Sequence, residues 1–437
     1  MLPPSPDTKR LAPLLLCFTA IALLIVWPIN GTTGLKNVLL LLGTGVSVRL
    51  LLQRRVRLQA SALLALSPAL AFFCWMLVQA LWISPYRAIA LHQVNSVWIA
   101  VLLAAFLGAM LGQLCSHDAQ VRRYTLLGLQ LFPFVYLLNF IGTTIELGHF
   151  SIPIDWDHGI YRDKIKIVFF GLIAMATAIT QVTQYYAQPA GRRLPWFSLA
   201  CIFMALASFL MVGTKTGVLQ SVLLAGVVAA LLLQQRLSRR SLLLFLLAAL
   251  TICAAAAWQV RNDKGWNNFF KSVEAGMDIE HYDNWQDYPA KGLPKFDGVY
   301  ETQESSYLRG AGARLGLLCL SQEPLGTGHL SEPLRYTRDV CAVMQKTTMF
   351  TTYSAIMDFT VVVGYPGALF FFGFFVVVIL RRQEGARASI TLQRLVPVAM
   401  LITWALSEVT ETHYYESTMF VLALLSTLRS QAGEASA

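Results

Sequence analysis

Two arginines and a glycine-rich turn lie close together in residues 258–350, the one long stretch without a membrane-length apolar run. Arg309 and Arg314 come first, and Gly326-Thr327-Gly328 follows. Arginine donates charge-assisted hydrogen bonds to phosphates and carboxylates, and glycine turns present backbone N–H groups to anions. We interpret this stretch as an anion-binding element in which the two arginines flank one groove.

A lysine stands in a second glycine-bounded turn, Gly213-Thr-Lys215-Thr-Gly217, between two apolar segments. So short a turn places Lys215 at the membrane–water boundary, at the N-terminus of the second segment. The partial positive charge of that helix end adds to the ammonium group. The Gly-x-x-x-x-Gly-Lys pattern of an ATP-binding loop does not occur here. The turn therefore indicates an anion site, with a lysine that only snorkels to the interface as the alternative.

Ionisable residues also gather in residues 146–166 and 407–416. The first segment contains Arg162, a candidate for contact with an anionic substrate, and histidines and aspartates whose spacing matches no metal-ligand pattern. The second contains His413 between Glu411 and Glu416. These groups suit either an ion pair with the basic residues or acid–base chemistry. We predict no metal site and no cofactor.

The composition requires a membrane protein, because 56% of the 437 residues are hydrophobic and only 13% are charged, with a mean hydropathy of +0.56. A bilayer core of roughly 30 Å needs about 20 apolar residues per helix. We predict an all-α integral membrane protein of about 12 transmembrane helices. The candidate segments are 11–29, 34–52, 60–84, 94–115, 124–147, 164–186, 194–212, 214–234, 241–258, 351–380, 390–408 and 414–429.

The net charge of +10 is placed as in membrane proteins and does not indicate nucleic-acid binding. With a cytoplasmic N-terminus, every inner loop carries lysine or arginine, as the positive-inside rule demands. Both chain ends are then cytoplasmic and the long stretch lies outside. The predicted organisation is nine helices in residues 1–258, a large outer loop in 259–350 and three helices in 351–437.

Several residues within this plan have a structural and a functional interpretation. Lys36 and Arg87 are expected to snorkel at the outer interface, whereas Asp358, inside an apolar span, is a functional or packing-partner residue. The aromatic residues of the outer loop form either its own small core or a sugar-binding surface. An amphipathic helix is predicted over 305–320, and Cys319 and Cys341 share the oxidising compartment, where a disulfide is possible.

Three features of the sequence resemble motifs of the O-antigen ligase and O-antigen polymerase superfamily, membrane glycosyltransferases of C-type (GT-C) architecture. The basic turn at Lys215 is similar to a Thr-x-Ser-Arg-Gly-like turn of that family. Arg309 followed by Pro324-Leu-Gly-Thr-Gly328 resembles its loop-helix motif. Tyr353-Ser354, nine residues and Gly364-Tyr-Pro-Gly367 resemble its His-[Asn/Ser/Gln]-x9-Gly-x-x-Gly signature.

The chain departs from that family at two of these positions. Lysine replaces arginine at Lys215, which keeps the charge but loses bidentate geometry. Tyr353 occupies the position of the histidine that the resemblance implies as the general base. His329, directly after Gly-Thr-Gly, and His413 are the histidines that remain as substitutes.

The resemblance implies transfer of O-antigen polysaccharide from undecaprenyl diphosphate to lipid A–core at the periplasmic face of the inner membrane of a Gram-negative bacterium. Arg162, Lys215, Arg309 and Arg314 would bind the diphosphate, and His329, Tyr353 or His413 would act as the base in an inverting reaction. Two alternatives stay open. An O-antigen polymerase would use the same donor with a second lipid-linked glycan as acceptor, and a lipid-linked glycan transporter would carry out no transfer.

Metal independence is testable on purified protein. Because Arg and Lys can neutralise the departing diphosphate without a cation, transfer is expected to persist unchanged in excess EDTA. A strict requirement for Mg²⁺ or Mn²⁺ would show that Asp155, Asp157 and His158 had been misjudged.

Overall fold

The computed structural model describes the chain in several ranges: residues 6–53, 56, 60–150, 160–161, 163–186, 194–233, 250, 254, 257, 261, 268–296, 300–328, 341, 349, 351–381, 391–407 and 411–429. Within them, the side chains of residues 6–10, 61, 215, 296, 300 and 301 are not described.

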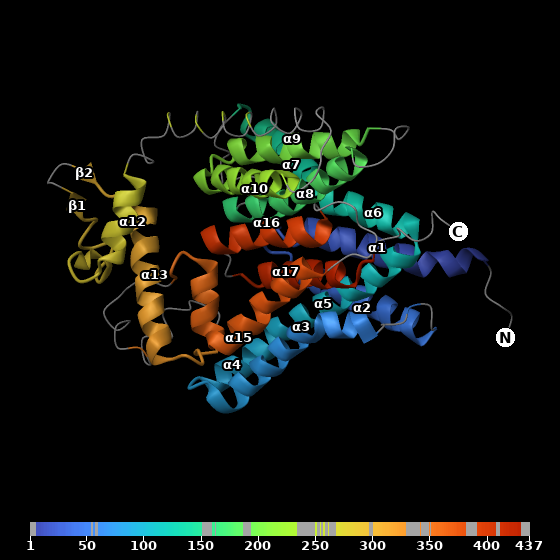
Figure 1. The fold of residues 1–437 in the computed structure, drawn as a ribbon, viewed down its shortest axis with the longest axis horizontal. Helices are drawn as coiled ribbons and strands as arrows, with labels where there is room; N and C mark the ends of the chain where they lie inside the picture. The colour runs from blue at the N-terminus through green and yellow to red at the C-terminus, as the bar shows by residue number, and fades with distance from the viewer. Residues whose placement is uncertain are drawn as a thin grey trace.

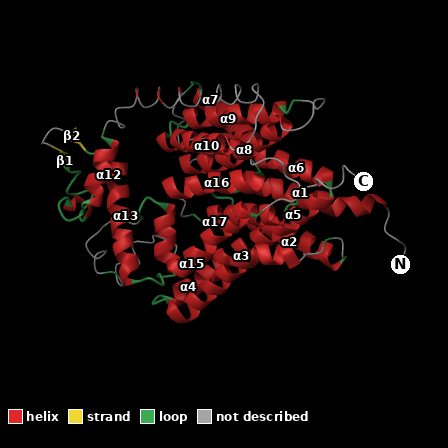
Figure 2. Ribbon diagram, in the orientation of Figure 1, coloured by secondary structure: helices red, strands yellow, loops and turns green. Residues whose placement is uncertain are grey.

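Nearly all regular structure in the described residues is helical (Figures 1 and 2). The first part contains α1 (Pro6–Val26), α2 (Thr33–Leu52), α3 (Ala60–Val78), η1 (Gln79–Ile83), α4 (Arg87–Gln93), η2 (Val94–Trp98), α5 (Ile99–His117), α6 (Ala119–Gln130), α7 (Phe132–Leu147), α8 (Lys164–Tyr186), α9 (Trp196–Met211) and α10 (Lys215–Leu233). The second part contains α12 (Phe269–Met277), η4 (Asp283–Trp285), the antiparallel strands β1 (Lys295–Phe296) and β2 (Tyr300–Glu301), α13 (Glu304–Gln322), α15 (Ala355–Leu380), α16 (Leu392–Leu406) and α17 (Thr412–Thr427).

Five described helices or continuous helical stretches are long and apolar enough to cross a bilayer, or six if the bent pair α6–α7 forms one span. The chain is therefore a membrane-embedded helical protein. Each expected span except the ninth coincides with a described helix or with consecutive helices, and 241–258 lies almost entirely outside the described residues. The segment expected as one straight span at 124–147 is two helices bent by 42°. Pro133 in the first turn of α7 explains the break, because proline cannot continue a preceding helix.

Helix α17 lies at the centre of the bundle, and nearly all of its side chains are buried. A Cβ atom at Gly108 or Gly112 of α5 would collide with the carbonyl groups of Phe420 and Leu424. Thr427 Oγ1 also donates to the Ala109 carbonyl at 2.9 Å. The two glycines thus permit a close approach of α5 and α17.

The two ends of the bundle differ in the residues that meet there. Trp27, just after α1, donates to Glu416 in the first turns of α17, while Arg429, just after α17, donates its backbone N–H to Ser116 in α5. Helices α1 and α17 thus run antiparallel. Figure 1 shows α12 and α13 beyond the end where α17 begins, and we call this the loop end of the bundle.

Helices α12 and α13 pack closely against each other. A Cβ atom at Gly276 or Gly310 would meet the backbone of the other helix. Trp285 and Tyr307 are buried in one hydrophobic cluster with residues of both helices, and Tyr307 Oη accepts from the Trp285 N–H at 3.1 Å. These two aromatic residues thus form a small core, as one of the two interpretations predicted. The predicted amphipathic helix is confirmed as α13, with Leu308, Ala311, Leu315 and Cys319 buried.

Helix α15 is broken at Gly364, whose φ of 70° is left-handed. The break leaves backbone carbonyls of Val361, Val362 and Val363 without helical partners. Thr327 N donates to the Val361 carbonyl at 3.3 Å and Gly328 N to that of Val362 at 2.8 Å. Trp75 Nε1 donates to the Val363 carbonyl at 2.7 Å. Residues 324–328 and helix α3 therefore donate hydrogen bonds to the carbonyls that the break exposes.

The break depends on glycine, so Gly364→Ala is expected to destabilise the protein. Gly364 has φ 70° and ψ 175°, a backbone region essentially confined to glycine that costs another residue about 1–3 kcal/mol. The Cβ of an alanine would also collide with the Leu325 backbone. We expect a loss of at least about 2 kcal/mol, seen as a lower thermal unfolding midpoint in detergent. Gly373→Ala is the matched control, because a Cβ at this helical glycine meets nothing within 4 Å. Equal unfolding midpoints for the two variants would contradict this account of the break.

Candidate functional site

Ser407 joins three helix ends at the loop end of the bundle. Its carbonyl accepts from the N–H of Ala355, the first residue of α15, at 2.9 Å. Its hydroxyl accepts from Gln220 Nε2 of α10 at 2.8 Å, and Gln220 Oε1 accepts from Thr403 Oγ1 of α16 at 3.0 Å. The start of α15, the start of α10 and the end of α16 are therefore neighbours.

The turn that bears Lys215 is a capped helix start. Thr214 Oγ1 accepts from the Gly217 N–H at 3.1 Å, and Gly213 has a φ of 65°. Gly217 packs against Val168 and Phe209 so closely that a Cβ would collide with them. Lys215 is the first residue of α10, as predicted, and its side chain lies outside the described atoms.

The turn before α15 holds Tyr353 in the left-handed region, at φ 56°. Among the described residues it is the only non-glycine residue with a positive φ. Asp358 Oδ1 accepts from the Thr352 N–H at 2.6 Å, and Tyr353 N donates to Thr351 Oγ1 at 3.2 Å. Asp358 thus anchors the turn, which explains a carboxylate inside an apolar span. Non-glycine residues held in this backbone region occur preferentially at functional sites.

Helix α13 brings its arginines beside this turn. A Cβ at Gly312 would collide with the Thr352 backbone, and one at Gly316 with the Met357 side chain. Arg309 is half-buried and Arg314 is exposed. Five residues on a helix correspond to a rotation of about 140°, so the two arginines point in different directions and do not face one groove together.

The Gly-Thr-Gly turn does not present free amides to an anion. Gly326 N donates to the Glu323 carbonyl, and the N–H groups of Thr327 and Gly328 donate to the carbonyls of Val361 and Val362. Our interpretation of this turn as an anion-binding element is wrong, because the broken α15 uses the amides that a ligand would need. His329, directly after the turn, lies outside the described residues, as does Arg162.

A charged cluster occupies the same end of the bundle, formed by Lys36, Asp163, Lys166, Glu411, His413 and Glu416. Lys166 is 1% exposed, and its ammonium lies 2.8 Å from Glu411 Oε2 and 3.8 Å from Asp163 Oδ2. It also donates to Asn30 Oδ1. Three chain segments far apart in sequence therefore share one buried lysine.

Lys36 and Glu416 form a second buried part of the charged cluster. Glu416 is 5% exposed and accepts from Trp27 Nε1 at 2.6 Å. Lys36 is 9% exposed and interacts electrostatically with Glu416. The expectation that Lys36 snorkels into solvent is wrong, because buried carboxylates balance its charge inside the protein. Arg87, in contrast, is exposed.

Asp163 and His413 complete the charged cluster. Burial raises the pKa of the Asp163 carboxyl above its ordinary value, and the nearby ammonium of Lys166 partly offsets the rise. His413 Nδ1 lies 3.3 Å from Glu411 Oε2. Its Nε2 is buried, with no hydrogen-bond partner in the described part of the chain.

Lys36, Lys166 and Glu416 were not candidate site residues in the sequence-based reading. The only signal was the position of each beside or within an apolar segment. Of the predicted residues, Lys215, Tyr353, Arg309 and His413 lie at the loop end, linked through Ser407, α13 and the 407–416 segment.

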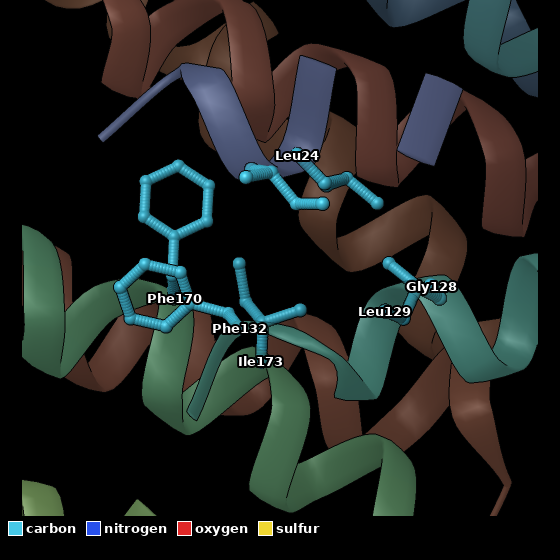
Figure 3. A pocket seen from close by; sticks show the side chains of 7 residues that line it. Leu24, Gly128, Leu129, Phe132, Phe170 and Ile173 are labelled. Atoms are coloured by element: carbon cyan, nitrogen blue, oxygen red, sulfur yellow. The ribbon is translucent and has the colours of Figure 1, made fainter. Parts of the chain in front are cut away.

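No group of three or more potential metal ligands occurs among the residues described here. Asp155, Asp157 and His158 fall outside them. A small pocket does occur between α1, α6, α7 and α8 (Figure 3). It is lined by Leu24, Ile25, Gly128, Leu129, Phe132, Phe170 and Ile173. It offers no side chain for polar chemistry and is separate from the charged cluster.

No family model, curated protein or solved structure matches the chain.

Replacing Lys166 tests the charged cluster as a structural element. Lys166→Met removes the ammonium that Glu411, Asp163 and Asn30 share, and leaves their polar atoms partly desolvated. We expect a loss of about 1–3 kcal/mol in the free energy of unfolding, measured by thermal unfolding in detergent. Lys164→Met, on the exposed side of the same turn, should change stability by less than about 0.5 kcal/mol. Equal effects from the two variants would contradict a structural role for the buried lysine.

Proposed function

We propose that the chain is an inner-membrane glycosyltransferase of Gram-negative bacteria that moves O-antigen polysaccharide from undecaprenyl diphosphate to lipid A–core, with both chain ends cytoplasmic and the site periplasmic. One observation carries the proposal: several helix N-termini and basic residues converge at one end of a membrane-embedded bundle. The starts of α8, α10, α15 and α17 are linked there through Ser407 and the charged cluster.

This convergence suits a reaction whose leaving group is a diphosphate. Each helix N-terminus carries a partial positive charge worth about 0.3–1 kcal/mol to a nearby anion. Lys215 at the start of α10 and Arg309 on α13 add full charges. No nucleotide sugar exists outside the cytoplasm, so the donor must carry its own leaving group in the lipid. Arg162, Lys215 and Arg309 are the proposed diphosphate ligands, whereas Arg314 points away from Arg309 and is not included. Stabilisation of the departing charge by these groups requires no metal.

The packing of the motifs supports the family resemblance independently of charge. Gly312 of the arginine-bearing helix packs on Thr352 beside Tyr353, and Gly326 packs on Gly364. Two of the three motifs that carry the resemblance therefore pack against each other as one structural unit. The about 12-span, GT-C-like architecture is part of the same proposal.

O-antigen polymerase is the second candidate, because Tyr353 stands where the ligase-type signature has histidine. A transporter is the third, favoured by the buried charged cluster, since ionisable residues inside membrane bundles often mark ion pathways. Purified protein in proteoliposomes, given lipid-linked O-antigen with either core lipid or a second lipid-linked glycan as sole acceptor, separates the three. Product on core lipid supports the ligase, a longer lipid-linked glycan supports the polymerase, and movement of the donor without transfer supports the transporter.

The diphosphate contacts give a mutational prediction for the same assay. Arg309→Ala and Lys215→Ala each lose a charge-assisted contact of about 1.5–3 kcal/mol, so transfer should fall by roughly 10- to 150-fold. Lys215→Arg should retain activity. Arg394→Ala, at the start of α16, is the control for loss of a cation elsewhere. Wild-type turnover by Arg309→Ala would remove this residue from the proposed site.

A further inference from the structure

The proposed reaction needs a general base, and the signature position does not supply an obvious one. That position holds Tyr353, and a tyrosine of pKa about 10 is mostly protonated near neutral pH. A base must have a free acceptor atom that a substrate hydroxyl can reach. Among the described residues, Glu411 meets both conditions. Its side chain is 54% exposed. The two ion-pair contacts it makes within the described part of the chain both go to Oε2, and neither goes to Oε1.

The orientation of the Glu411 carboxylate is set through that other oxygen. Lys166 Nζ lies 2.8 Å from Oε2 and His413 Nδ1 lies 3.3 Å from it. Lys166 is itself fixed by Asn30 and by burial, and the His413 ring packs against that of Tyr414, tilted by 39° with 4.4 Å between centroids. When two buried groups bind one oxygen of a carboxylate, the second oxygen points in a defined direction. The carboxylate then does not have to lose further conformational entropy when a substrate binds.

His413 is less suited to be the base itself. Its Nδ1 faces the carboxylate, so the remaining acceptor would be Nε2, which is buried. A sugar hydroxyl cannot reach that atom in this structure. His413 and Lys166 are therefore positioning residues that act through Glu411.

Glu411 also lies near the rest of the proposed site. It is the N-cap residue of α17 and follows Ser407, the residue linked to Ala355 and Gln220, by four positions. Four residues span at most about 14 Å. The carboxylate thus belongs to the same end of the bundle as the Tyr353 turn and the start of α10.

We propose that Glu411 is the general base that activates the acceptor hydroxyl, an assignment that rests on the proposed glycosyl transfer. Glu411 Oε1 takes the hydroxyl proton as the acceptor oxygen attacks the anomeric carbon of the donor. The new carbon–oxygen bond forms on the face opposite the leaving group. The bond from the anomeric carbon to the diphosphate oxygen breaks, and its electron pair leaves with undecaprenyl diphosphate.

Azide distinguishes a base from a structural residue, because azide attacks carbon without losing a proton. In the purified full-length protein, Glu411→Gln should lower transfer to the hydroxyl acceptor by about 10²- to 10⁴-fold. Added sodium azide should then restore release of undecaprenyl diphosphate and yield the glycosyl azide. Glu146→Gln is the matched control, since it makes the same change at an exposed carboxylate near the end of α7, outside the charged cluster, and should change transfer by no more than about threefold. Thermal unfolding of each variant checks that the fold is intact.

The outcomes separate this assignment from the proposed function. An active wild type with an equally active Glu411→Gln overturns the assignment alone. A folded Glu411→Gln that is inactive and stays inactive with azide also overturns it, because the residue then serves something other than proton removal. A wild type that transfers glycan to neither acceptor overturns the proposed function, and the assignment with it.

Discussion

The constraint that shapes this protein is that a backbone inside a membrane must satisfy its own hydrogen bonds. Helix α15 breaks that rule at Gly364, and three carbonyls need donors from elsewhere. The donors are the amides of Thr327 and Gly328 and the indole of Trp75. Gln79 Nε2 adds bonds to the carbonyls of Leu325 and Val362, at 2.7 and 2.9 Å.

These hydrogen bonds connect the segment that follows α13 to α3 and to α15. Ser84 Oγ, just after η1, reinforces it by donating to the Thr327 carbonyl at 2.6 Å. As a consequence, α13 and its arginines are held at the loop end of the bundle from two sides. Gly312 rests on the turn before α15, and residues 324–328 rest on the break within it. A proposed diphosphate site built on α13 would therefore be rigid relative to the membrane helices.

At the same end of the bundle, lysines and carboxylates are placed close together, so that their opposite charges balance. The charged cluster places two lysines and three carboxylates where α1, α2, α8 and α17 begin or end. A buried lysine alone would be costly, and a partner with good geometry offsets that cost without making the pair strongly stabilising. The arrangement is better understood as orienting groups than as a source of stability. It fixes Glu411, which remains half exposed.

The positions of the helices follow from the sequence alone, because the length of an apolar run decides whether it can cross a bilayer. The buried face of α13 follows from the spacing of its apolar residues for a similar reason, since it reflects a local periodicity. The sequence also located Lys215 at a helix start and Tyr353 at the beginning of a predicted span. The break in α15, the use of the Gly-Thr-Gly amides, the left-handed Tyr353 and the burial of Lys36 and Lys166 were decided only by tertiary structure. Each of these depends on a contact between residues far apart in the chain, such as Gly326 with Gly364 or Lys166 with Glu411, and no local pattern specifies which distant partner a free carbonyl or a buried ammonium will find.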